Sequence, residues 1–288
     1  MLSYILVLIA VVLLACDFSV VKFFQKTEGS DSVTGLKFNA ILGLFTAVLF
    51  FFIGGCRFTA SWFSILMAAL MSLFCASYTQ IGFKILQKGN LALYTFFLMS
   101  GGMILPYLFG VFFLDEELNL LRAAGLVIFT VAILLAGDTK LSIDKKGLLL
   151  CFAVFVLNGG CSIVSKFHQI DPLSNAVDSK EFVMLTGLWR AIFSTIMLLA
   201  TPQSKEKTTG FSKKTVLIIV ASAGFSGLSY LLQLIGAVDL PATVLYPLIT
   251  GGSMIFTAIA GRVIFKEKIT KKQAISIGLC FAGTLLFL

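Results

Sequence analysis

Ten apolar stretches, each about as long as a membrane crossing, fill almost the whole sequence. About 20 helical residues, rising 1.5 Å each, cross the roughly 30 Å hydrocarbon core of a bilayer. Lipid supplies no hydrogen-bond partner for an exposed backbone N–H group, so helices are expected. We therefore predict an all-α polytopic membrane protein with ten transmembrane helices. The stretches are approximately 3–23, 33–54, 62–86, 90–114, 118–137, 147–167, 181–200, 214–236, 240–264 and 272–288.

The composition favours a membrane protein and argues against a nucleic-acid-binding one. Hydrophobic residues make up 58% of the chain and charged residues 12%, against about 45–50% and about 25% in soluble domains. The net charge is +8, but basic residues stand singly or in pairs at predicted helix ends, where they meet the membrane surface. No phosphate-binding loop or histidine–carboxylate metal motif occurs. We expect no cofactor, no metal and no catalytic residues, and we do not expect an enzyme.

Short sequences recur in the same order about 150 positions apart. Their common order and nearly constant offset predict two copies of one five-helix unit, residues 1–138 and 145–288. Five membrane crossings reverse the direction of the unit that follows, so the copies are expected to be inverted, as in many transporters whose site lies between the copies. The matched segments are Val21–Gln25 with Ser165–Gln169, Thr34–Leu36 with Thr186–Leu188, Ser77-Tyr78 with Ser229-Tyr230, Glu116 with Glu267, and Gly125 with Ser276.

The distribution of lysine and arginine predicts the orientation in the cell membrane. The odd-numbered connections between the predicted helices and their flanks carry sixteen basic residues, and the even-numbered ones carry four. Positive residues remain in the cytoplasm. The odd connections are therefore expected to be cytoplasmic and both termini outside.

Several short motifs occur in a fixed order along the chain. They are the Lys-Phe pairs at 22–23 and 166–167, Arg190-Ala191, Tyr246 with Gly251, and Glu267-Lys268-Ile269-Thr270 followed by Gln273 and Gly283. In this order they resemble the EamA-type ten-helix members of the drug/metabolite transporter superfamily and, more distantly, the small multidrug resistance proteins. The resemblance implies a secondary transporter that moves a small organic metabolite or drug by alternating access, usually as export. A flippase for a lipid-linked group and a non-transporting membrane scaffold are the alternatives.

The chain departs from these relatives at three points. Small multidrug resistance proteins use a glutamate in their first helix, whereas Leu14 and Asn158 stand at that position here. EamA-type proteins often carry an arginine in the first copy where this chain has Asn39. Many relatives keep their termini in the cytoplasm, opposite to the lysine distribution of this chain.

Charged residues deep in apolar stretches are the first candidates for a substrate site, because charge at membrane depth is costly and usually functional. Asp17 can bind a proton or a cationic group, or it can lie at the interface paired with Lys22. Arg190 stays charged, so it can hold a carboxylate or phosphate of the substrate, or pin two helices together. The partners expected are a small-molecule substrate, the lipid bilayer and, through Asp17, protons. The chain can be a monomer or a homodimer.

Polar and aromatic residues complete the candidate site, which we expect to form from the first, second, fourth, sixth, seventh and ninth helices. The asparagines can contact the substrate or cross-link helices. The aromatic pair can stack on the substrate or anchor at the membrane interface, and Tyr94, Tyr230, Gln80 and Gln233 are weaker candidates. The substrate-binding candidates are Arg190, Asp17, Asn158, Asn39, Tyr246 and Trp189.

The remaining predictions concern packing and helix ends. Hinge or packing residues in the fourth and ninth helices are Gly101, Gly102, Pro106, Gly251, Gly252 and Pro247, since glycine lets backbones approach and proline frees a carbonyl. We expect Lys22 and Lys166 to extend to the membrane surface. His168 is expected at the surface, and Glu116 and Glu267 are expected to act as turn and capping residues.

Overall fold

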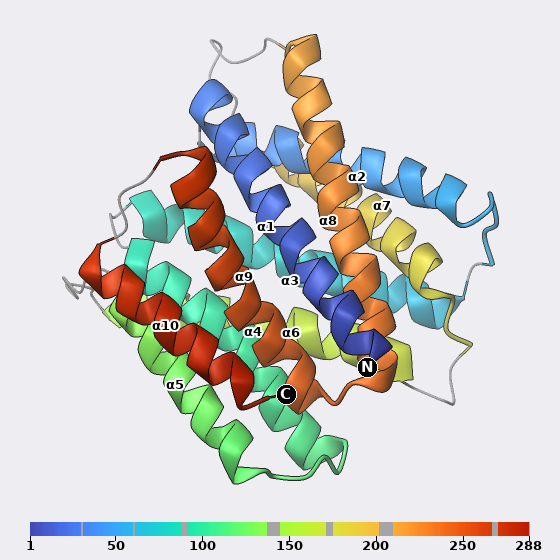
Figure 1. The fold of residues 1–288 in the computed structure, drawn as a ribbon. Coiled ribbons are helices and arrows are strands. Elements are labelled where there is room, and N and C mark those ends of the chain that lie inside the picture. Colours follow the sequence, from blue (N-terminus) through green and yellow to red (C-terminus); the bar gives the residue numbers. More distant parts are fainter. Residues whose placement is uncertain are drawn as a thin grey trace.

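The computed structural model describes residues 1–29, 31–59, 61–87, 91–136, 145–170, 175–201, 210–266 and 270–287. Helices account for nearly all of these residues, and no strand occurs among them (Figure 1). The predicted all-α fold with ten helices is confirmed. The helices are α1 (Leu2–Glu28), α2 (Ser32–Ile53), α3 (Trp62–Gln87), α4 (Leu91–Phe113), α5 (Leu120–Ala136), α6 (Lys145–Ile170), α7 (Ser179–Ala200), α8 (Lys213–Asp239), α9 (Ala242–Ile264) and α10 (Lys271–Leu285).

In the described part of the chain, eight helices are long and apolar enough to cross a membrane: α1–α4 and α6–α9. The other two are shorter than the apolar stretches that predicted them. α5 has 17 residues and α10 has 15, which corresponds to about 25 Å and about 22 Å of helix. The two short helices pack against each other.

Both termini lie at the same end of the helix bundle (Figure 1). The same end carries the turn between α8 and α9 and the connection between α4 and α5. We call this end the terminal face. The other end, which carries the last turns of α1 and α9, is called the opposite face.

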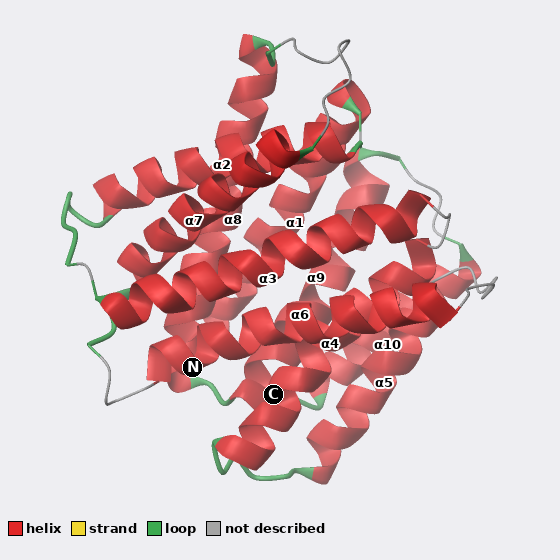
Figure 2. Cartoon of the chain, turned by 180° about the vertical axis from the view of Figure 1, so that it is seen from behind, coloured by secondary structure: helices red, strands yellow, loops and turns green. Residues whose placement is uncertain are grey.

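The two halves of the chain interlock rather than forming separate bundles. α1 lies between α8 and α9 (Figure 1), and α6 lies between α3 and α4 (Figure 2). α2 packs on α7, α4 on α9 and α5 on α10. These pairs map onto one another when every helix number is shifted by five. The largest hydrophobic cluster accordingly joins side chains from both halves.

Helix starts also recur between the halves, at a spacing of 151 residues. Ser61 precedes α3 and Ser212 precedes α8, and each hydroxyl accepts a backbone N–H from three residues further on. Asn119 accepts the N–H of Leu121 before α5, and Thr270 caps α10 in the same place. Such side chains satisfy N–H groups that have no partner within the helix. Both halves therefore begin these helices at matching positions.

A left-handed residue stands at the same place in each half, with φ of 53° at both Asp115 and Lys266. The next residue in the first half is Glu116, whose carboxylate accepts the first two backbone N–H groups of α9. The predicted capping role of Glu116 is therefore confirmed. The corresponding residue Glu267 lies outside the described residues, as do Gly137 and Lys140 near the predicted boundary between the copies.

Glycines allow the closest helix crossings between the halves. A Cβ atom on Gly43 of α2 would lie 2.6 Å from the Gly187 oxygen and 2.7 Å from the Ala191 nitrogen of α7. A Cβ on Gly187 would lie 2.9 Å from the Gly43 oxygen. Backbone atoms cannot move aside as side chains can, so only glycine permits this crossing.

The predicted glycines of α4 and α9 serve close packing. A Cβ on Gly101 would lie 2.2 Å from the Phe155 oxygen, and one on Gly251 would lie 2.1 Å from the Phe129 ring. The adjacent glycines have similar neighbours: Gly102 faces Asn158 at 2.6 Å, and Gly252 faces Val11 at 2.9 Å. Pro106 and Pro247 lie inside continuous helices, and a hinge at these positions stays a prediction.

Two expectations about polar side chains at the end of α6 are wrong. His168 was expected at the surface but is 1% exposed. Its ring stacks on Phe182 with centroids 3.6 Å apart, and its Nε2 lies 2.8 Å from the Ser64 hydroxyl. A neutral imidazole can be buried here because Ser64 of α3 and Phe182 of α7 contact the ring, and Gln169 donates to its second nitrogen. Sequence alone does not reveal this cover.

Lys166 was expected to reach the membrane surface but is 4% exposed. Its ammonium donates to the carbonyl oxygens of Ala237 and Leu240, at 2.6 Å and 2.7 Å. These acceptors at the end of α8 replace the water that the ammonium would otherwise require. Lys22, at the matching position of the first half, is half-buried.

Replacing Gly43 with alanine is expected to destabilise the bundle, because the new methyl group meets backbone atoms of α7. Overpacking of this kind costs about 1–3 kcal/mol, which outweighs the gain of about 1 kcal/mol in helix propensity. Thermal unfolding in detergent should give a lower midpoint for Gly43→Ala. Gly224→Ala in α8 is the matched control, since nothing lies within 4 Å of its Cβ position. Equal midpoints for both variants would contradict the proposed tight crossing.

Candidate functional site

A cavity of about 440 Å³ lies in the centre of the bundle, where the two halves meet. Its wall is built by α1, α2, α3, α4, α6, α7, α8 and α9, while α5 and α10 contribute no lining residue among those described. Six of these helices were expected, and α3 and α8 are additional. Asp17 and Arg190 are the charged side chains among the described lining residues.

Asp17 lies on the cavity wall, one helical turn after the lining residue Leu14. Its side chain is 8% exposed, and the hydroxyl of Ser222 on α8 donates to its carboxylate. Of the two interpretations that the sequence left open, this geometry favours a cavity-lining carboxylate over one paired with Lys22.

Arg190 lines the cavity and is held in place by Asn39 from α2. The Asn39 side-chain oxygen accepts from Nε at 3.1 Å and from Nη2 at 2.6 Å, and its amide nitrogen donates to the Gly35 oxygen. A guanidinium has five N–H donors, more than one amide oxygen can accept. Asn39 is not among the described cavity-lining residues; it orients Arg190 and does not accept from all of the guanidinium's donors.

Three other predicted side chains divide between the cavity and its surroundings. Asn158 lines the cavity and ties α6 to α4, because its amide donates to the Leu98 oxygen at 2.7 Å. Tyr246 lines the cavity, and its hydroxyl donates to the Ser162 oxygen at 2.5 Å. Trp189 does not line this cavity and instead stacks on Phe193 with centroids 5.3 Å apart.

Sequence reasoning gave too little weight to the tyrosines of α3 and α8. Tyr78 and Tyr230 both line the cavity. The Tyr230 hydroxyl lies 2.8 Å from the Ser165 hydroxyl and 2.9 Å from the Met71 sulfur. Both tyrosines belong to the repeated Ser-Tyr pair, which was the available signal. Of the weaker candidates, Gln233 lines the cavity, whereas Gln80 does not and accepts from Ser32.

A second hollow, of about 780 Å³, leads from the central cavity toward the opposite face. It lies among α1, α4, α9 and α10 and carries Lys22 and Arg262. Phe18 and Met99 line both the hollow and the central cavity. The two spaces therefore adjoin.

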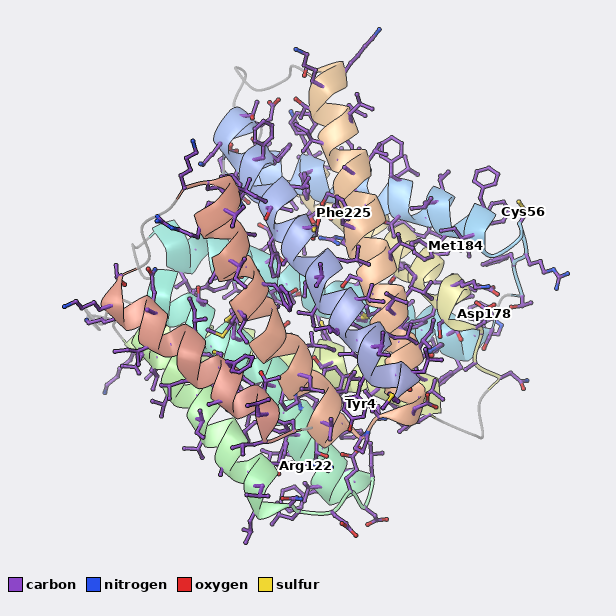
Figure 3. The ribbon with its side chains drawn as sticks, in the orientation of Figure 1. Tyr4, Cys56, Arg122, Asp178, Met184 and Phe225 are labelled. Carbon is purple, nitrogen blue, oxygen red and sulfur yellow. The ribbon has the colours of Figure 1, made fainter. Side chains whose placement is uncertain are left out.

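A third hollow, of about 1130 Å³, lies at the terminal face between the α2–α3 and α6–α7 connections. Its wall includes Asp178 and Met184, both labelled in Figure 3. It shares no described lining residue with the central cavity. The central cavity thus adjoins a hollow toward the opposite face and shares no described wall with the hollow at the terminal face.

The cavity wall carries charged, polar and aromatic groups of the kinds that bind small solutes. Within the described ranges, no three His, Cys, Asp or Glu side chains gather to form a metal site. The wall offers one guanidinium, one carboxylate, three tyrosine rings and several hydroxyl groups. About half of the described lining residues carry polar side chains, and apolar surface with convergent polar groups is typical of small-molecule sites.

Comparison with known proteins agrees with this geometry. A model of the EamA-like transporter family matches residues 145–288. One protein of known crystal structure superposes with a TM-score of 0.79 over 99% of this chain and 95% of its own, at 14% sequence identity, which shows a shared fold. No curated protein matches the chain. Because the family model covers half of the sequence, the chain belongs to the EamA-like transporter family.

Proposed function

We propose that the protein is a secondary transporter that exports a small organic solute across the cell membrane by alternating access. Membership of the family makes it a multi-pass membrane transporter of small solutes. The observation that carries the finer proposal is the central cavity of about 440 Å³, with Asp17 and Arg190 on its wall. A non-transporting scaffold predicts a filled interior, so this cavity argues against the scaffold alternative.

We infer that the halves are inverted copies that move against each other around the cavity. Three matches between the halves support this: the packing pairs, the caps spaced by 151 residues and the left-handed residues before the two glutamates. In such transporters the two copies form similar openings on opposite sides of the membrane. The hollow beside the central cavity then represents the path to the opposite face.

The solute is proposed to carry a carboxylate or a phosphate. A guanidinium binds either group through two parallel hydrogen bonds, and Asn39 already fixes one edge of Arg190. The tyrosines supply apolar ring surface with a polar end. Asp17 is proposed as the group that carries a proton during transport, since it is the carboxylate among the described lining residues.

Replacing Arg190 with alanine is expected to lower export of anionic or zwitterionic solutes at least about tenfold, because hydrogen bonds to charged groups contribute about 1.5–3 kcal/mol. The measurement is an efflux profile of cells without the native gene, complemented by each variant, over a metabolite panel. Arg122→Ala on α5, outside the cavity (Figure 3), should export normally. Normal efflux by folded Arg190→Ala would remove Arg190 from the site.

Replacing Asp17 with asparagine is expected to abolish the response of transport to a proton gradient, since an amide cannot carry the proton. The measurement is solute flux in proteoliposomes with and without an imposed pH difference. Glu117→Gln, an exposed residue of the α4–α5 connection, serves as the control and should retain the response. A full response in Asp17→Asn would show that another group carries the proton.

The orientation can be read from a native cysteine. Cys56, labelled in Figure 3, is exposed in the α2–α3 connection. Two helices long enough to span the membrane precede this connection, so it lies on the side of the N-terminus. If the termini lie outside, a membrane-impermeant maleimide should label Cys56 in intact cells and should fail with Cys56→Ser. Gly210→Cys, placed at the opposite face in the Cys56→Ser chain, should react only after permeabilisation. The reverse pattern would place the termini in the cytoplasm.

A further inference from the structure

The α8–α9 turn is held from two sides by opposite charges. On one side, the Lys166 ammonium of α6 donates to the oxygens of Ala237 and Leu240, at 2.6 Å and 2.7 Å. These carbonyls belong to the end of α8, where the helix dipole is negative and cations are stabilised. The ammonium is buried, so these contacts are what stabilises its charge away from water.

On the other side, Glu116 binds the start of α9. Its Oε1 accepts the Ala242 N–H at 2.6 Å, and its Oε2 accepts the Thr243 N–H at 2.8 Å. A carboxylate at a helix N-terminus satisfies free N–H groups and complements the dipole. The site is built for this carboxylate, because a Cβ on Gly110 would lie 2.5 Å from Oε2.

The two charged residues come from different halves of the chain and act on the same turn. Lys166 belongs to the second half, and Glu116 belongs to the connection between α4 and α5 of the first half. One helical turn further in, Tyr246 of α9 donates to the Ser162 oxygen of α6, and both of these residues line the central cavity. The charged contacts therefore lie between the cavity and the terminal face.

The matching lysine of the first half has different surroundings. Lys22 lines the hollow of about 780 Å³ that leads to the opposite face. Its ammonium lies 4.9 Å from the centroid of the ring of Phe265, the residue that follows α9. Thus one of the two equivalent lysines is buried on helix carbonyls near the terminal face, and the other lines a hollow.

We propose that Lys166 and Glu116 form a gate at the terminal face, which holds the α8–α9 turn closed over the central cavity and must release it for that face to open. The proposal rests on the proposed alternating access. Charge-assisted hydrogen bonds are stronger than neutral ones, yet both charged groups regain hydration when the face opens. The contacts therefore favour closure without making it irreversible.

The test measures opening of the terminal face directly, without any solute. Lys166→Met keeps the apolar stem and removes the ammonium, and Glu116→Gln removes the negative charge. Hydrogen exchange of the peptide that contains Ala242 and Thr243 is measured by mass spectrometry in the full chain in lipid nanodiscs. Each variant should exchange there at least about tenfold faster, because loss of a charge-assisted hydrogen bond shifts a two-state equilibrium by that order.

A reporter cysteine gives an independent reading. Ala237 lines the cavity beside the gate and is 2% exposed. With the six native cysteines replaced by alanine, Ala237→Cys should react with a soluble maleimide faster by a similar factor when combined with Lys166→Met. Thermal unfolding of each variant in detergent distinguishes gate opening from loss of the fold. If the cysteine-free chain does not fold, hydrogen exchange in the chain with its native cysteines is used instead.

Lys22→Met is the matched control, because it removes the equivalent lysine at the other face. It should accelerate neither the exchange of α9 nor the labelling of Ala237→Cys. Wild-type rates in both gate variants, or an equal increase in Lys22→Met, would overturn the proposal. If the gate variants open faster while efflux assays of the protein detect no exported solute, the gate is supported and the transport function is contradicted. If the protein exports a solute while the opening rates of the gate variants are unchanged, the transport function is supported and the gate is contradicted.

Discussion

Polar groups inside this bundle must find partners within the protein, because lipid offers none. The charged side chains on the cavity wall are each matched by a group from another helix. Asp17 of α1 accepts from Ser222 of α8, and Arg190 of α7 donates to Asn39 of α2. These contacts cross between the halves, so the requirement that makes helices obligatory in lipid also connects the two halves around the site.

The helix pattern follows from the sequence because apolar length is a local property. The ten stretches correspond to the ten helices, and Glu116 caps a helix as its polar surroundings indicated. α10 ends at Leu285, before the apolar residues Leu286 and Phe287, since apolarity alone does not mark where a helix stops. The repeated Ser-Tyr pair marks two tyrosines, Tyr78 and Tyr230, that line the cavity.

The site was less accessible to sequence reasoning because it depends on which side chains meet. Asp17, Arg190, Asn158 and Tyr246 share the cavity wall, as residues chosen for polarity within apolar helices can. Asn39 does not line the cavity but acts on the site indirectly, because its side-chain oxygen accepts a hydrogen bond from Arg190. His168 and Lys166 were misplaced because a position near a helix end predicts exposure only when no neighbouring helix covers that end. Such cover is a tertiary property that appears nowhere in the local sequence.

Equivalent residues in the two halves do not have equivalent surroundings. Lys22 and Lys166 occupy matching positions, yet one lines a hollow and the other is buried on the carbonyls of α8. A pair of copies that packed with full symmetry would leave both faces equally open or equally closed. Under the proposed alternating access, movement between two asymmetric arrangements would exchange the surroundings of the two lysines. The contacts that close one face would then offset part of the cost of opening the other, so a modest difference in solute or proton binding would drive the change.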